Sequence, residues 1–199
     1  MEPTTQNRHL TYPEYEALEQ QSELRYEYEA GQVYAMAGGT LNHNGITGNV
    51  YSGLKGQVRG KSCKVYFSDV KVEVLKQISY RYPDVVVACH PFDLRGTNQL
   101  IRQPRLIVEV LSKSTEQVDR NIKWQRYQRI SSLVYYMLVD QYKPRVELFS
   151  RIEETNEWIY AAYESLDDVI VLPRLNAELP LAAIYEDIEF GGEEESEEI

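Results

Sequence analysis

The chain has 199 residues, of which 43% are hydrophobic and 26% charged, and its formal net charge is −10. This is the composition of an ordinary globular domain, while the negative charge argues against a general nucleic-acid binder, which normally carries a basic footprint. The sequence holds no run of about 18 apolar residues and no apolar leader, so it predicts neither a membrane span nor a secretory signal. Cys63 and Cys89 fit neither a disulfide framework nor a zinc motif. They are predicted to be two reduced core thiols in a cytoplasmic protein.

One domain is predicted over residues 1–190, with an acidic tail over residues 191–199. Glutamates dominate that tail after Gly191-Gly192, and such a run of like charges is typical of a disordered, solvated terminus. The first ten residues are predicted to be a flexible leader. The rest of the chain is still acidic, so any contact with nucleic acid has to come from a local basic patch or from a metal at an acidic site.

In chain order, the pattern first predicts a short helix from Thr11, a cap residue followed by acidic residues, to about Gln20. Alternation around Gly31 then predicts a hairpin in which Tyr26–Tyr28 pairs with Val33–Ala35. An amphipathic helix follows, because apolar residues recur every four positions. Those residues are Ile46, Val50, Leu54 and Val58.

The middle of the chain predicts a bent strand or hairpin over Lys64–Phe67 and Val70–Leu75, and then two central strands, Val85–Cys89 and Leu106–Leu111. A capping box, Ser114-Thr115-Glu116-Gln117, opens a helix to about Arg129. The remaining predicted elements are a buried strand, a meander of two strands and a last short helix. They cover Val134–Val139, Pro144–Phe149 with Trp158–Tyr163, and Leu179–Tyr185. The fold class is α/β or α+β, with one mixed sheet flanked by helices.

The two central strands each carry one carboxylate, Asp84 where the first begins and Glu109 inside the second. Little alternation in such an apolar run indicates a strand buried on both faces, where a charge is rare unless it is paired or binds a metal. If the strands are neighbours, both carboxylates can hold a hard divalent cation through oxygen. The alternative is a pair of strand-end carboxylates that face solvent or pair with Arg81 and Arg105.

Lys123 stands four residues after Asp119 on the predicted helix. The two residues could form an ordinary exposed i,i+4 ion pair. Alternatively, Lys123 projects back over the sheet, where it orients a water or stabilises charge on a phosphate.

Three further residues have both a structural and a functional interpretation. Asp69 either forms a turn between two strands or adds a carboxylate to a metal site. Glu27 either faces solvent on an edge strand or belongs to the same site. His43 precedes a helix, where it either satisfies free backbone amides or acts as a ligand or base.

Motifs for other chemistry are missing from the sequence. It contains no GxGxxG, P-loop, HExxH or GxSxG motif, and its histidines do not have the spacing of a zinc site. The carboxylates and the lysine are therefore the candidates for catalysis.

The order and spacing of several short segments carry a family resemblance. These segments are Tyr26-Glu27, Gly31-Gln32-Val33-Tyr34, Asn42-His43-Asn44, Ser68-Asp69-Val70, Tyr82-Pro83-Asp84-Val85, Val108-Glu109-Val110-Leu111-Ser112, Asp119 to Lys123, Leu138-Val139-Asp140 and Leu179-Pro180-Leu181. Together they resemble the PD-(D/E)XK nuclease superfamily, and within it the Uma-two-type restriction endonucleases of prokaryotes. The resemblance covers roughly residues 10 to 188.

This resemblance implies a restriction-endonuclease-like core that acts on DNA, in which Asp84 and Glu109 hold a divalent metal, Mg²⁺ or Mn²⁺. The sequence departs from the superfamily pattern at Leu111, which stands where the motif has its lysine; Lys123 on the following helix is the matching residue. The resemblance also makes Glu27 and Asp69 accessory members of the site, and it is consistent with a homodimer.

Two classes of function remain open at this level. The first is a metal-dependent endonuclease, with hydrolysis of a smaller phosphoester as a variant of the same chemistry. The second is a non-catalytic binding or assembly module on the same fold, favoured by the acidic charge, the missing motif lysine and the sixteen tyrosines, a residue type enriched at interfaces. The position of Lys123, inside a cleft or in bulk water, discriminates between them.

Overall fold

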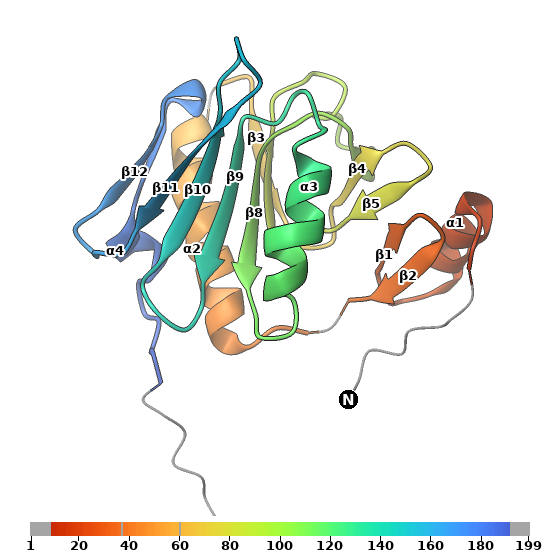
Figure 1. Ribbon diagram of the computed structural model, residues 1–199, viewed down its shortest axis with the longest axis horizontal. Helices are drawn as coiled ribbons and strands as arrows, with labels where there is room; N and C mark the ends of the chain where they lie inside the picture. The colour runs from red at the N-terminus through yellow and green to blue at the C-terminus, as the bar shows by residue number, and fades with distance from the viewer. Residues whose placement is uncertain (1–8, 37, 60, 192–199) are drawn as a thin grey trace, which may run out of the picture.

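A six-stranded mixed sheet forms the centre of the molecule in the computed structural model, which describes residues 9–36, 38–59 and 61–191. Its strand order is β11-β10-β9-β8-β6-β3, and only the β8–β9 pair is parallel. The strands are β3 (Lys64–Phe67), β6 (Val85–Ala88), β8 (Pro104–Leu111), β9 (Tyr135–Asp140), β10 (Val146–Arg151) and β11 (Trp158–Tyr163). Figure 1 shows the long helix α2 (Leu41–Val58) behind this sheet and α3 (Trp124–Tyr127) in front of it.

The central strands are buried because both faces of the sheet are covered. All four residues of β6 are buried, as are most of β8 and all of β9, which is the pattern expected of apolar runs without alternation. Val85 and Val87 join the core beneath α2, whereas Val86 and Ala88 join the core beneath α3. The prediction of two adjacent central strands is confirmed.

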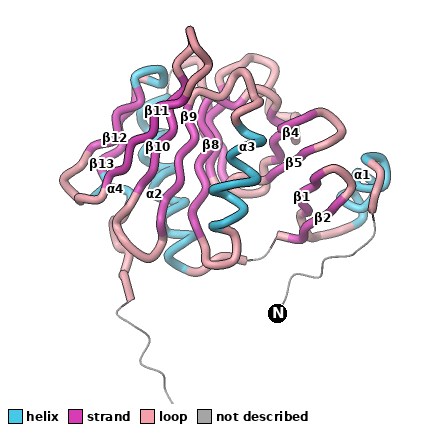
Figure 2. Tube along the Cα trace, viewed as in Figure 1, coloured by secondary structure: helices cyan, strands magenta, loops and turns pink. Residues whose placement is uncertain are grey.

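A smaller five-stranded sheet lies beside the central one and carries the N-terminal part of the chain (Figure 2). Its order is β2-β1-β5-β4-β7. The elements are α1 (Tyr12–Gln21), β1 (Tyr26–Glu29), β2 (Gln32–Ala35), β4 (Lys71–Leu75), β5 (Ser79–Arg81) and β7 (Leu100–Ile101). Packed tyrosine rings from α1, β1 and β5 form most of its core, with Tyr15 and Tyr28 stacked at 4.8 Å.

The first two predicted helices and the hairpin are confirmed. The helix α1 begins with a capping box between Thr11 and Glu14. Thr40 caps the N-terminus of α2, and its hydroxyl accepts the backbone N–H of His43 at 3.1 Å. β1 pairs antiparallel with β2 across the turn at Gly31, which has a positive φ of 98°. Glycine adopts that conformation without the steric cost of a Cβ.

Three predictions about the later elements need correction. Lys64–Phe67 and Val70–Leu75 are not one bent strand or hairpin, because Ser68 and Asp69 take positive φ angles and send β3 and β4 into different sheets. The capping box at Ser114 does not form; instead the Ser112 hydroxyl accepts the N–H of Thr115 at 3.2 Å. The helix that follows covers residues 116–127 and contains a π-helical segment, the π-turn η1 (Val118–Lys123), before α3.

The last predicted helix is shorter than expected, because its first two residues, Leu179 and Pro180, belong to a strand. A hairpin, β12 (Val169–Leu172) with β13 (Ala177–Pro180), precedes α4 (Leu181–Ile184). The short 3-10 turn η2 (Pro173–Leu175) connects the two strands. The hairpin packs on α2 with its apolar side, so alternate residues are exposed. Neither of its strands was predicted from the sequence.

Cys63 and Cys89 form a disulfide, so the prediction of two reduced thiols is wrong. They flank the ends of β3 and β6, and Lys64 pairs with Ala88 in the antiparallel ladder. Cys63 and Cys89 stand one position beyond this pair, and their Cα atoms lie 4.0 Å apart although 26 positions separate them in the sequence. Reduced thiols therefore no longer support the predicted cytoplasmic location.

The predicted acidic tail begins at Gly191, and its residues 192–199 lie outside the described residues, as do residues 1–8 of the predicted leader. Leu10, by contrast, is buried, and its N–H donates to the Gly31 carbonyl at 2.8 Å. No helix within 9–36, 38–59 and 61–191 is long and apolar enough to cross a membrane.

Candidate active site

Asp84 and Glu109 lie on neighbouring strands and share one face of the central sheet. Val85 of β6 pairs with Val108 of β8 in an antiparallel register, which places Asp84 and Glu109 one position further along the same ladder. Because side chains alternate along a strand, Asp84 shares a face with Val86, and Glu109 with Ile107 and Leu111, the face beneath α3. The Asp84 Oδ2 accepts the Val110 N–H at 2.6 Å, which fixes the carboxylate against β8.

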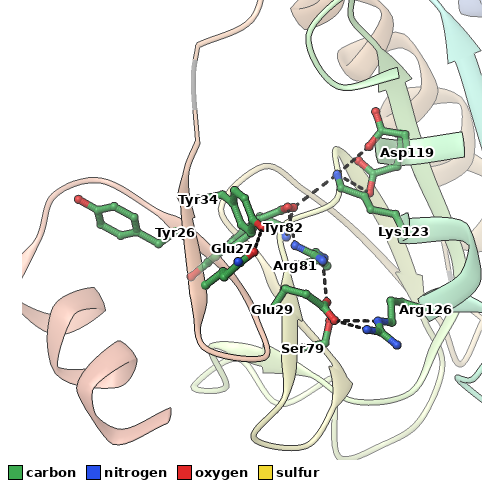
Figure 3. Close-up of polar contacts among 12 residues, drawn as sticks. Tyr26, Glu27, Glu29, Tyr34, Ser79, Arg81, Tyr82, Asp119, Lys123 and Arg126 are labelled. Atoms are coloured by element: carbon green, nitrogen blue, oxygen red, sulfur yellow. Dashed lines mark hydrogen bonds and ion pairs between the residues drawn. The ribbon is translucent and has the colours of Figure 1, made fainter. Parts of the chain in front are cut away.

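Lys123 reaches the same face from the π-turn. Its side chain is only 8% exposed, and its Nζ lies 2.9 Å from Asp119 Oδ1, 3.1 Å from Glu109 Oε1 and 3.4 Å from Glu27 Oε1 (Figure 3). The i,i+4 pair with Asp119 considered from the sequence exists, but it is buried rather than exposed, with Asp119 2% exposed. π-Helical turns are rare and often occur at functional sites. Here the turn places Asp119 and Lys123 on the buried side of the helix.

The cluster around Lys123 holds more negative than positive charge. Burial raises the pKa of Glu109 well above its usual value, and the carboxylates of Asp119, Asp84 and Glu27 act in the same direction, against the charge of Lys123. Burial lowers the pKa of Lys123, but Glu109, Glu27 and Asp119 outweigh it and raise that pKa well above the usual value. The Lys123 ammonium therefore keeps its proton, and this single positive charge faces the three carboxylates of Glu109, Glu27 and Asp119.

Glu27 comes from the smaller sheet and bridges two cations. Its Oε2 lies 3.1 Å from Arg81 Nη1, and its Oε1 accepts the Tyr82 N–H at 3.3 Å while facing Lys123 (Figure 3). Arg81 is 2% exposed and also binds Glu29 at 2.7 Å. Arg81, one of the two arginines that might have neutralised the strand carboxylates, is engaged by Glu27 and Glu29 instead. Arg105, the other, has no ion pair among the described residues.

His43 and Asp69 lie nearer the surface, in front of Asp84. A hollow of about 320 Å³ is lined by Asp84, His43 and Asp69 among others. His43 Nε2 is 3.4 Å from Asp84 Oδ2. Burial lowers the pKa of His43, but the hydrogen bond and charge of Asp84 outweigh it and raise the pKa on balance. The structure thus brings His43 to the Asp84 side of the cluster, while Asp69 forms the turn between β3 and β4.

Two participants were missed from the sequence as site residues. Tyr127 donates its hydroxyl to Glu109 Oε1 at 2.8 Å, and Arg81 orients Glu27. Tyr127 stands four residues after Lys123, so the helical spacing was a usable signal for it. Arg81 had no such signal for pairing with Glu27, because their contact joins strands that are far apart in the sequence.

The donor set of this site fits a hard divalent cation. Within 9–36, 38–59 and 61–191, no group of three or more His, Cys, Asp or Glu side chains is arranged to hold a metal by itself. Mg²⁺ is usually held through one or two carboxylates and keeps water and substrate phosphate oxygens as its other ligands. Asp84 and Glu109 supply two such carboxylates on one face, and the surplus of negative charge around Glu109 favours a cation there.

The architecture and the site together define a mixed α/β protein with a restriction-endonuclease-like core. A crystal structure from Anabaena variabilis ATCC 29413, described as a "putative nuclease belonging to DUF820", superposes with a TM-score of 0.73 over 88% of this chain and 97% of that chain, at 14% identity. The two proteins therefore share a fold.

The sequence matches the model of one family, Uma2, described as "Putative restriction endonuclease", over residues 12–183. The chain belongs to this family. Two proteins of Synechocystis sp. are 32% identical to it: "Uncharacterized protein slr1290" over 91% of this chain and 94% of its own length, and "Uncharacterized protein sll1609" over 75% and 85%.

Proposed function

We propose that this protein is a metal-dependent endonuclease that hydrolyses phosphodiester bonds of DNA. The observation that carries the proposal is the meeting of three groups at the central sheet: Asp84, the residue just before β6, Glu109 from β8 and the Lys123 ammonium from the π-turn, 3.1 Å from Glu109. Lys123 forms an ion pair with Glu109, and the further carboxylates of Glu27 and Asp119 surround the same ammonium. Membership of the Uma2 family supports the same chemistry.

Asp84 and Glu109 would hold Mg²⁺ or Mn²⁺ in this proposal. When bound, such a cation supplies Lewis-acid neutralisation of phosphate charge and a more acidic water. The Val110 N–H holds Asp84 in a fixed orientation, and the Tyr127 hydroxyl does the same for Glu109.

Lys123 has a separate role, because its raised pKa keeps it cationic. It donates hydrogen bonds to the attacking water or to a phosphate oxygen and stabilises the charge that grows there; it does not accept a proton. Glu27 holds the ammonium at 3.4 Å from the opposite side. We assign His43 an accessory role in holding Asp84, and Asp69 an accessory role in shaping the entrance.

A non-catalytic binding or assembly module on the same fold is the second candidate. The observation that favours it is the closed network around Lys123, in which the ammonium meets Asp119, Glu109 and Glu27 within 3.4 Å. A lysine engaged by three carboxylates can serve stability alone. Leu111 at the position of the motif lysine and the charge of −10 point the same way.

Cleavage of plasmid and single-stranded DNA with Mg²⁺ or Mn²⁺ separates the two candidates. Wild-type protein should nick or linearise DNA in a metal-dependent way, and Asp84→Ala protein prepared identically should not. Equal residual activity in both preparations would indicate a contaminant and favour the binding module.

We also propose that the working form is a homodimer, because two copies of the site suit the cutting of two strands. Size-exclusion chromatography with light scattering at working concentrations should then give twice the chain mass of 23.1 kDa.

A further inference from the structure

The hollow in front of Asp84 is lined by apolar side chains and an arginine that have no role in the proposed metal-dependent cleavage. Its volume is about 320 Å³, and it adjoins a second hollow of about 650 Å³, with Arg25, Asp69 and Tyr82 lining both. The smaller volume lies at the low end of the roughly 300–1,000 Å³ range of small-ligand pockets. A volume of this size can enclose a single nucleotide unit, whereas it cannot enclose a duplex.

One wall of the smaller hollow is apolar. Leu24 and Met36 line it and are 55% and 36% exposed, beside Gly38 and Gly39. Exposed apolar side chains that gather at a cleft mark a surface with a ligand to bind. The outside of duplex DNA offers such side chains mainly charged phosphate and sugar, whereas an unpaired base exposes an apolar face.

Arg25 supplies a cation at the same place. Within the described ranges it has no ion-pair partner, whereas Lys71, which lines the larger hollow, is engaged by Glu19 at 3.4 Å. Glu23 and Asp69 also line the smaller hollow, so a polyanion can approach only if Arg25 and a cation at Asp84 offset their charge.

The depth of the site restricts its substrate further. The side chains of Glu109 and Lys123 are 4% and 8% exposed, and Asp84, 19% exposed, forms part of the hollow. Of the three residues, Asp84 alone lines the hollow, so a phosphate that approaches Asp84 through the hollow has to enter it. Duplex DNA has a persistence length of about 50 nm, so its backbone does not bend into so small a space, whereas an unpaired strand does.

We infer that the hollow is a binding site for one unpaired nucleotide beside the scissile phosphate, with Arg25 on the neighbouring phosphate and Leu24 and Met36 against the base. The inference rests on the proposed function and narrows its substrate to single-stranded or locally unpaired DNA.

Fluorescence anisotropy measures DNA binding at the hollow independently of DNA cleavage. The probes are a fluorescein-labelled single strand of about 12 nucleotides, within the usual site sizes of single-strand binders, and the matching duplex. Ca²⁺, which also binds oxygen ligands but accepts looser geometry, replaces Mg²⁺. Wild-type protein should bind the single strand at least about tenfold more tightly than the duplex, a difference of about 1.4 kcal/mol.

The variants separate the phosphate contact from the base contact. Arg25→Gln should weaken single-strand binding about tenfold and reduce the log–log salt slope by about 0.7, the contribution of one phosphate contact. Leu24→Ala with Met36→Ala should weaken binding several-fold and leave that slope unchanged. The matched controls are Arg59→Gln, at the far end of α2 about 24 Å from His43, and Leu41→Ala, which is 92% exposed but outside the hollow; both should bind like wild type.

The outcomes distinguish this inference from the proposed function. Metal-dependent cleavage with Arg25→Gln binding the single strand as tightly as wild type would overturn the nucleotide site and leave the endonuclease standing. Tighter binding of the duplex would overturn it as well. Arg25-dependent binding of the single strand without cleavage by any preparation would support the site and favour the binding module.

Discussion

Two glutamates in the central sheet, Glu109 of β8 and Glu147 of β10, are almost equally buried, at 3% and 4% exposure, yet their pKa values move in opposite directions. Burial opposes ionisation of both. Hydrogen bonds from Arg120 and Arg145 outweigh it at Glu147 and lower the pKa there, with Arg145 Nη2 at 2.7 Å. At Glu109 one ammonium faces several carboxylates, so the pKa rises.

The two glutamates differ in two respects: Glu109 lies deeper in the protein, so burial raises its pKa more strongly, and it has one ammonium nearby where Glu147 has two arginines. Together these differences separate an ion pair that serves stability from a candidate site. A buried carboxylate with two arginines has its charge compensated within the chain. A buried carboxylate among others does not, and perturbed groups of that kind cluster at functional sites.

The largest effect should come from removing a carboxylate of the site. Asp84→Ala or Glu109→Gln should reduce DNA cleavage by about 10³-fold or more, since the stabilisation of phosphate charge is lost. In wild type, Mg²⁺ at 100 times its Kd should stabilise the fold by about 2.7 kcal/mol, which raises the Tm by about 5–10 °C. Both variants should lose that rise in differential scanning fluorimetry.

Without metal, Glu109→Gln should melt no lower than wild type, because it removes one of several mutually repelling carboxylates while keeping the shape of the side chain. Glu147→Gln, the same substitution in the same sheet, is the control and should retain the full response to Mg²⁺. An unchanged metal response in both Asp84→Ala and Glu109→Gln would remove the site from consideration.

Replacement of Lys123 should give the next largest effect. Lys123→Ala should lower turnover about 10²–10³-fold, the usual consequence of losing one group that stabilises transition-state charge. Its metal affinity, measured by calorimetry, should remain close to that of wild type, because lysine is not an oxygen ligand. Lys123→Arg should rescue poorly, since a planar guanidinium does not reproduce a compact ammonium.

If Lys123→Ala protein cuts DNA as fast as wild type, the lysine serves stability only. Thermal melting decides that alternative directly. A structural lysine should then lower the Tm on removal without changing the rate per folded molecule.

A partial rescue should follow from restoring the motif lysine. Leu111 is 2% exposed and shares the face of β8 with Glu109 and Ile107, so Leu111→Lys places an ammonium beneath α3. In the Lys123→Ala background this change should recover part of the lost turnover. Leu106→Lys, which points into the core beneath α2, is the matched control and should recover none.

Much of this architecture could be predicted from local patterns. The strands β6, β8 and β9 follow from apolar runs, and α2 follows from the spacing of Ile46, Val50, Leu54 and Val58. These signals depend on near neighbours in the chain, and the adjacency of β6 and β8 followed from the requirement that Asp84 and Glu109 meet.

The remaining features depend on contacts that no local pattern encodes. The Cys63–Cys89 disulfide follows from the pairing of β3 with β6, and the approach of Glu27 to Lys123 brings strand β1 of the smaller sheet against the π-turn. The division of β3 and β4 between two sheets depends on positive φ angles at Ser68 and Asp69. Serine and aspartate can adopt these angles, but their presence in a sequence does not predict them.

The smallest effect should come from Glu147, and it should appear in stability rather than catalysis. Its folded-state pKa is lowered, so its contribution is present above the unfolded value of about 4.3 and is lost as the pH falls through the folded value. At pH 7, Glu147→Gln should therefore reduce the free energy of unfolding by roughly 1.5–3 kcal/mol, the range for a hydrogen bond to a charged group, with cleavage unchanged.

At pH 3, below the unfolded value of about 4.3, the gap between the two proteins should be smaller than at pH 7, because protonation of Glu147 removes its attraction for Arg120 and Arg145 and is complete only below the lowered folded value. Urea unfolding at both pH values measures this gap. A gap of the same size at pH 3 as at pH 7 would show that the loss comes from packing and that the arginines do not compensate the buried charge. In that case the contrast between Glu147 and Glu109 would no longer mark Glu109 as the carboxylate in need of a cation.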